Sequence, residues 1–133
     1  MNLNIPYLET DNKLLNDAYR IAAGDIVGNI VYYQNGLLTE EKPCMIAGLD
    51  YNTPWTRDTA INIWNALSIL SPEVSKNTLL AVLEEEEGSI YIGGQYWDSI
   101  IWMIGAREYC RFHKDDNFYR LAFEAGRNSV HRL

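Results

Sequence analysis

Apolar residues along the chain follow two helical patterns, one after the other. From Leu14 to Ile30 they recur about every fourth position, on one side of a helix that Thr10 or Asp11 can cap. From around residues 53–58 to about Leu70 they cover nearly every side of the predicted helix. A helix with one apolar stripe lies at a surface, whereas a helix that is apolar all round is buried. The sequence therefore predicts a surface helix followed by a buried one.

Three further predicted helices continue this alternation. The third begins at Ser71-Pro72, with Ser as cap and Pro in the first turn; it is amphipathic and ends before Gly88. The fourth opens near Trp97-Asp98 and is apolar on consecutive positions, so we expect it to be buried. The fifth is capped by Asp115 or Asp116 and is amphipathic again.

The connections carry weaker signals. Asn35-Gly36 predicts a turn, with a short hairpin formed by Tyr32-Tyr33 and Leu37-Leu38 on either side of it. Residues 90–92 lie between glycines and predict at most one short strand. The acidic run at residues 84–87 is interpreted as a solvated helix end.

Alternating surface and buried helices are typical of two concentric helical layers. The predicted fold class is therefore all-α, a partial (α/α)6 toroid of outer and inner helices, with a short β-hairpin between the first two. About five helices form only part of a ring, so residues 1–133 are interpreted as one incomplete segment that continues beyond the chain end in a parent enzyme. A plain helical bundle is the alternative.

Composition restricts the classes of partner. The chain is 47% apolar and carries 18 acidic against 11 basic residues, a formal charge of −7. This excludes a disordered chain and argues against binding to nucleic acid, which requires a basic face. The sequence shows neither a signal peptide nor an apolar stretch of membrane-spanning length, so we expect a cytoplasmic protein that does not bind membranes.

Few residues have the spacing of a metal or cofactor site. Cys44 and Cys110 are expected to be free thiols. His113 and His131 have no metal-ligand spacing and are expected to lie at the surface or at helix ends. Gly93-Gly94 does not follow a strand and open a helix in the manner of a nucleotide-binding loop. We therefore expect no metal and no cofactor.

Tryptophans fall into two groups. Trp64 and Trp102 lie within the two apolar helices and are predicted to be core residues. The other two stand at the starts of these helices, in residues 52–59 and 93–98. Inner helices of a layered fold run in the same direction, so both starts would open at one end of the molecule.

Both helix starts combine aromatic with charged side chains. Sugars bind to such mixtures, since their C–H faces pack on aromatic rings and their hydroxyls bind carboxylates and Arg. Two simpler alternatives are that Asp58 and Asp98 are N-caps, and that Arg57 pairs only with the adjacent Asp58. The candidate substrate-binding residues are Trp55, Arg57, Asp58, Tyr96, Trp97 and Asp98.

Two motifs resemble a known family. Residues 51–59, Y-N-T-P-W-T-R-D-T, resemble the W-x-R-D-T signature of six-hairpin glycosidases, the superfamily of glucoamylase-like, debranching amylo-1,6-glucosidase-like and trehalase-like enzymes. Residues 98–104, followed by Glu108-Tyr109 and Lys114-Asp115, resemble the D-x-x-L-W-x-I … Y … G-D helix of the debranching-type branch. Together the two matches span most of residues 51–119.

The resemblance implies a function and a division of roles. Arg57 and Asp58 match the pair that grips hydroxyls of the non-reducing sugar, and Trp97 and Asp98 match a second wall of that pocket. The acid and base of the superfamily lie on later helices, so no catalytic residue is expected in this chain. A carboxylate at a helix start also has its charged form stabilised, which suits holding a hydroxyl better than donating a proton.

We therefore expect the N-terminal part of a glycoside hydrolase acting on α-glucosides or related oligosaccharides, with hydrolysis and phosphorolysis both open. Its expected partners are an oligosaccharide or glycoside and, through exposed inner helices, a second copy of the chain. The alternative function is a non-catalytic helical module that binds carbohydrate or another partner.

Overall fold

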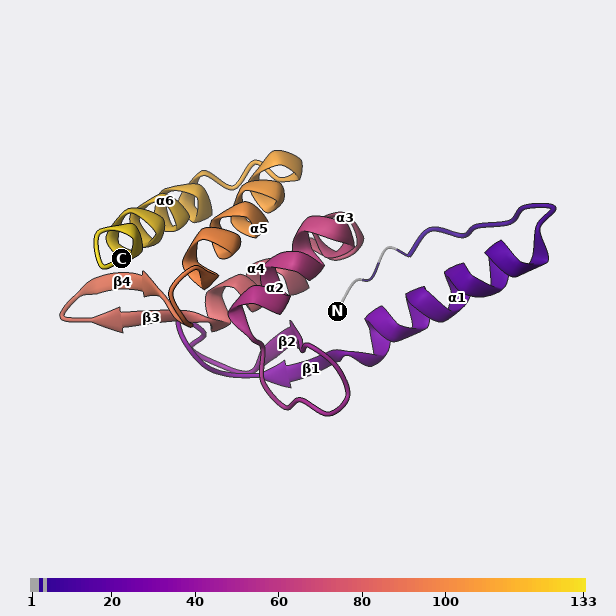
Figure 1. Cartoon of the computed structure of the whole chain (residues 1–133), viewed down its shortest axis with the longest axis horizontal. Helices are drawn as coiled ribbons and strands as arrows, with labels where there is room; N and C mark the ends of the chain where they lie inside the picture. The colour runs from indigo at the N-terminus through magenta and orange to yellow at the C-terminus, as the bar shows by residue number, and fades with distance from the viewer. Residues whose placement is uncertain (1–2, 4) are drawn as a thin grey trace.

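The computed structural model describes residue 3 and residues 5–133 of the chain. This part contains five helices and two antiparallel β-hairpins (Figure 1). The second helix is continuous from Thr56 to Leu70 and includes a π-helical stretch, Ile63–Leu67. The parts of the second helix on either side of that stretch are α2 (Thr56–Asn62) and α3 (Ser68–Leu70). The other elements are α1 (Lys13–Gly28), β1 (Ile30–Tyr33), β2 (Lys42–Met45), α4 (Pro72–Ala81), β3 (Leu83–Glu86), β4 (Ser89–Ile92), α5 (Asp98–Phe112) and α6 (Asp116–Val130).

The predicted fold class, an all-α partial (α/α)6 toroid, is wrong. The chain forms a small mixed α/β fold in which both hairpins pack against helices. β2 lies along α4, and β4 lies along α6. Helical periodicity in the sequence located the helices, but the strands have only four residues each, too few to show an alternation of their own.

The second hairpin lies in the acidic run. Glu87 and Gly88 both have a positive φ, 51° and 77°, which is the conformation of a two-residue hairpin turn. This turn pairs Glu86 with Ser89 and, at the far end, Leu83 with Ile92. Because that last pair is buried in the core, the run is held as a strand. Its glutamates are exposed, as predicted, but their assignment to a helix end is wrong.

The first hairpin lies between α1 and α2, but its second strand is later than predicted. β1 pairs with β2, whereas Leu37-Leu38 lies in the connecting loop. The loop is anchored on the end of α4, where the Leu37 N–H donates to the Leu80 carbonyl oxygen at 3.1 Å. A Cβ on Gly36 would lie 2.5 Å from that oxygen, so glycine allows this close approach.

The core lies between α2, α4, α5 and α6. Trp102 on α5 is fully buried, and its indole Nε1–H donates to the Leu79 carbonyl oxygen at 3.3 Å. Phe118 on α6 packs between Trp102 and Tyr109, with ring centroids 6.4 and 5.0 Å away. The prediction that Trp102 is a core residue is confirmed.

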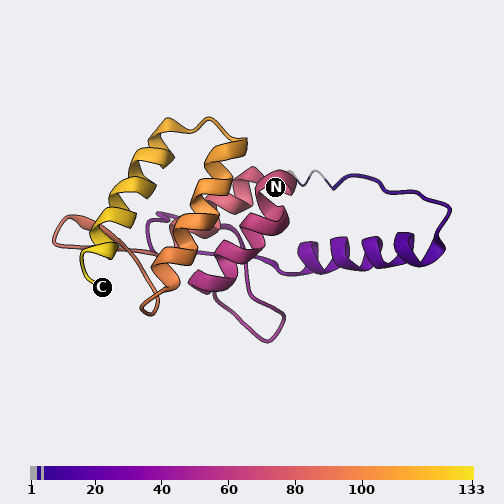
Figure 2. The ribbon, with the colours of Figure 1, turned by 45° about the horizontal axis from the view of Figure 1, so that its top comes forward.

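Helices α2 and α5 are not buried on all sides, contrary to the prediction. Each has one side against the core and another in solvent. Trp64, in the π-helical stretch that continues α2, is 54% exposed, so its assignment to the core is wrong. The neighbouring elements cover only one side of each helix, which leaves the apolar residues on the other side in water. α1 extends away from the other helices and has no buried residue (Figures 1 and 2).

Helices α2 and α5 lie side by side and run in the same direction (Figure 2). Three successive contacts establish this, since residues 57, 60 and 68 meet residues 98, 105 and 113 in the same order. A Cβ on Gly105 would lie only 2.8 Å from the Ala60 Cα, so glycine lets the helices approach closely. The N-termini of α2 and α5 therefore open at the same end of the molecule.

Candidate functional site

A pocket of about 390 Å³ lies where α2 and α5 begin. It is lined by residues 53–58 from the first helix start, and by residues 94–95 and Asp98 from the second. Four of the six predicted binding residues therefore line one pocket: Trp55, Arg57, Asp58 and Asp98.

The other two predicted residues lie outside the pocket wall. Trp97 stacks on Arg57, with the guanidinium carbon 5.4 Å from the ring centroid. Tyr96 is 83% exposed and has a positive φ of 31°. Tyr96 thus takes no part in the pocket as it stands in this structure.

Local sequence fixes how the two segments meet. The Thr56 hydroxyl donates to the Gly93 carbonyl oxygen at 2.8 Å, which ties the start of α2 to the loop before α5. Gly94 has φ +110°, and a Cβ there would lie 2.9 Å from an Asp98 carboxylate oxygen. A larger residue would collide with the carboxylate that closes the pocket.

Arg57 and Asp98 form the polar centre of the pocket. Arg57 donates to one oxygen of Asp98, Oδ1, from Nε at 3.0 Å and from Nη2 at 2.9 Å. The other oxygen, Oδ2, accepts from the Gln95 N–H at 3.0 Å. The carboxylate side chain is only 12% exposed, against 46% for the arginine. Arg57 is thus held by Asp98 and by the Trp97 ring, which fixes the orientation of its donors.

Asp58 is the carboxylate left available for a ligand. It is half-buried on the pocket wall, and none of the described residues forms a hydrogen bond or ion pair with its side chain. It does not cap α2, because the N-cap residue is Trp55, and it does not pair with Arg57, which binds Asp98 instead. Asp98 likewise follows the N-cap of its helix, Trp97. Neither simple alternative from the sequence holds.

Two aromatic side chains lie just before α2: Trp55, which lines the pocket, and Tyr51, which contacts it. Trp55 is in extended conformation just before α2 and is 55% exposed. Tyr51 meets it edge to face, with centroids 5.9 Å apart. Trp55 therefore presents an accessible ring beside the Arg57–Asp98 pair. Tyr51 and Gln95 were not among the predicted residues, although both lie in the two motif-bearing segments.

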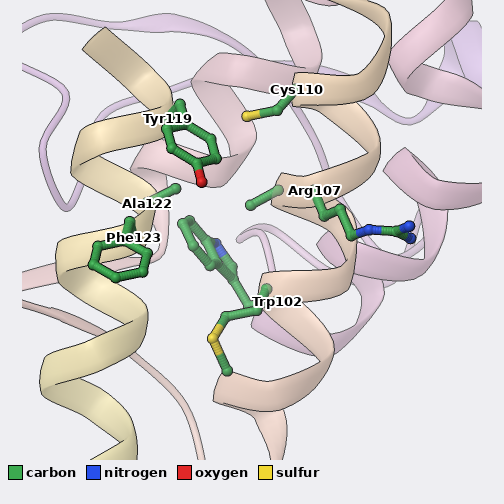
Figure 3. A pocket seen from close by; sticks show the side chains of 8 residues that line it. Trp102, Arg107, Cys110, Tyr119, Ala122 and Phe123 are labelled. Carbon is green, nitrogen blue, oxygen red and sulfur yellow. The ribbon is translucent and has the colours of Figure 1, made fainter. Parts of the chain in front are cut away.

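A second hollow, of about 170 Å³, lies between α5 and α6. Figure 3 shows Tyr119, Ala122 and Phe123 on α6 facing Trp102 and Cys110 on α5, with the Arg107 side chain directed away. It has an apolar lining and no carboxylate. Burial raises the pKa of the Cys110 thiol, which favours its protonated form.

Comparisons with protein-family models, with curated proteins and with solved structures found no match to this chain. The resemblance to six-hairpin glycosidases therefore stays a prediction. In the described part of the chain, none of the helices is long and apolar enough to cross a membrane. No three His, Cys, Asp or Glu side chains among the described residues gather as metal ligands would.

Proposed function

We propose that the pocket at the starts of α2 and α5 binds a sugar residue of an α-glucoside or related oligosaccharide. One observation carries the proposal: an oriented Arg57–Asp98 pair, an unpaired Asp58 carboxylate and an exposed Trp55 ring share one pocket. Its volume, about 390 Å³, lies in the range of small-molecule sites.

The chemistry of the pocket suits a neutral polyhydroxyl ligand. Adjacent hydroxyls of a sugar ring are both donors and acceptors, so they can donate to Asp58 and accept from Arg57 at the same time. The apolar face of the same ring packs on an indole such as that of Trp55. The chain would thus supply the sugar subsite of a glycoside hydrolase, as the family resemblance implies, and none of its residues is proposed as the acid or base.

A calorimetric titration of the chain with maltose and related α-glucosides tests this proposal. We expect saturable binding, with a loss in Trp55→Ala of at least tenfold in affinity, because the apolar face of the sugar loses its platform. Trp64→Ala is the matched control: it removes an equally exposed tryptophan outside the pocket and should leave the affinity unchanged. Absence of binding by the native chain, or equal losses in both variants, would overturn the proposal.

Replacing the unpaired carboxylate is a second check on the same binding. Asp58→Asn keeps the size of the side chain but replaces one acceptor oxygen with a donor, so we expect a loss of sugar affinity as large as that in Trp55→Ala.

The cytoplasmic location and the non-catalytic alternative stay predictions.

A further inference from the structure

Large apolar side chains are exposed on the solvent side of the α2–α5 pair. Between 37% and 54% of each is accessible, although they belong to the helices that build the core. We call this surface the α2–α5 face and define it as Ile61 of α2, Trp64 of the π-helical stretch that continues α2, and Ile100 and Ile104 of α5.

The four side chains lie on one side of the molecule. On α5, Trp102 and Ala106 point into the core and Gly105 contacts Ala60 of α2. At about 100° per residue, Ile100 and Ile104 then lie away from the core, next to α2. Ile61 and Trp64 lie on the corresponding side of the neighbouring helix, beside the buried Ala60 and Ile63.

We propose that two copies of this chain associate through the α2–α5 face, with their helices antiparallel across a two-fold axis. The area fits a second copy. With the adjacent Trp97, whose exposed fraction is 62%, the face presents about 500 Å² of apolar surface, as large as the largest patch on a typical monomer. Two such faces, with Trp97 in each, can together bury at most about 1,000 Å², which is at the lower limit for a specific interface.

The distribution of charge also fits a second copy. The chain carries a net charge of −7, but the four residues of the α2–α5 face are uncharged. Arg107, one turn after Ile104 on the same side of α5, borders the face and pairs with Glu108 at 3.3 Å. Ion pairs lie at each end of the face: Arg57–Asp98 near the helix N-termini, and Glu108 with both Arg107 and Arg111 towards the C-terminal end of α5. Glu108 is buried and accepts twice from Arg111, at 3.0 and 2.8 Å. Two copies can therefore meet without burying an unpaired charge.

The helix direction selects the antiparallel arrangement. Since α2 and α5 run the same way, a parallel dimer would bring four like helix ends together. A two-fold axis that crosses the helices at right angles, in the plane of the interface, places each N-terminal end against the partner's C-terminal end. Opposite ends of helix dipoles attract, and like ends repel. The interface is then closed, so association stops at the dimer.

Sedimentation equilibrium of the native chain over a broad concentration range tests this proposal. We expect a mass twice the 15.3 kDa of one chain at high concentration, and a monomer on dilution. Ile104→Lys should remain monomeric throughout, because it places a charge in the apolar face of both copies. Trp64→Ser should lower the affinity of dimerisation at least tenfold. Each replaced side chain is exposed, so the far-ultraviolet circular dichroism of both variants should match that of the native chain.

Phe123→Lys is the control, because it adds the same charge at another exposed apolar position, on α6 beside the other hollow; Phe123 is 64% exposed and Ile104 is 37% exposed. It should dimerise like the native chain. A native chain that is monomeric at every concentration, or that associates beyond a dimer, would overturn the proposal. So would a dimer that Phe123→Lys abolishes and Ile104→Lys does not. The sugar titration on monomeric Ile104→Lys is a separate readout, so failure of either proposal leaves the other standing.

Discussion

Gly105 is the residue at which α5 comes closest to α2. The space for a side chain there is taken by backbone, with the Ala60 Cα and carbonyl oxygen 2.8 and 3.1 Å from the position of a Cβ. Backbone cannot move aside as the end of a flexible side chain can. The spacing of the two helices, and hence the distance between the two walls of the pocket, depends on the absence of a side chain at this position.

We predict that Gly105→Ala lowers the free energy of unfolding by about 1–3 kcal/mol, the usual cost of overpacking. Gly24→Ala on α1 is the control, because a Cβ at Gly24 meets nothing within 4 Å. In an exposed helix interior that change should instead stabilise by about 0.5–1 kcal/mol. Urea unfolding of both variants measures the difference, and equal effects of the same sign would show that Gly105 does not set the helix spacing.

Tryptophan shows what the sequence can predict at this scale. Trp64 and Trp102 both lie in apolar helices, yet the first is 54% exposed and the second is fully buried. Local pattern detects that a helix has apolar residues on every side, but not how many neighbours the fold supplies. Helices α2, α4 and α6 pack against the side of α5 that carries Trp102, whereas no described element covers Trp64.

Among the elements, α6 is stabilised by a charged cap. Asp115 accepts from the Phe118 N–H at 3.0 Å and pairs with Lys76 of α4 at 2.6 Å. The hydrogen bond from Lys76, followed by that from the Phe118 N–H, lowers the pKa of Asp115. A carboxyl group with a lowered pKa in the folded state stabilises the fold above its unfolded pKa, about 4, and this contribution is lost as the pH falls through the lower folded value.

We predict that Asp115→Asn lowers the free energy of unfolding at neutral pH by up to about 1 kcal/mol, as for a partly exposed ion pair. Asn retains the capping ability, so the variant isolates the charge. The difference from the native chain should shrink as the pH falls below about 4. Asp116→Asn, an exposed neighbour without the Lys76 contact, should show a smaller change. A pH-independent difference for Asp115→Asn would contradict the role of its charge.

The sequence predicted the starts of the helices better than it predicted the hairpins. Ser71 and Asp115 cap α4 and α6 as expected, since a cap is a local hydrogen bond within three residues. α1 starts after Asn12, whose side chain accepts from the N–H groups of Leu14 and Leu15, instead of after Thr10 or Asp11. The strand in the acidic run was missed because its partner and the core fix it, and neither is visible in a stretch of glutamates.

At the scale of the whole molecule, two distant segments meet at one pocket. The starts of the two helices were expected from the sequence to open at one end, and the Arg57–Asp98 hydrogen bonds join them. The layered toroid on which this expectation was based is wrong, so a complete ring of helices is not needed to bring these segments together. Their meeting requires only that α2 and α5 pack in parallel, which the close contact at Ala60 and Gly105 allows.

The measurement that tests the central claim most directly is the response of the four indole N–H signals of the chain to a maltooligosaccharide in nuclear magnetic resonance spectra. If the pocket binds sugar, the signals of Trp55 and Trp97 should shift with saturation, while those of exposed Trp64 and buried Trp102 stay in place. No shift at any indole, or a shift of Trp64 alone, would contradict a sugar site at the starts of α2 and α5.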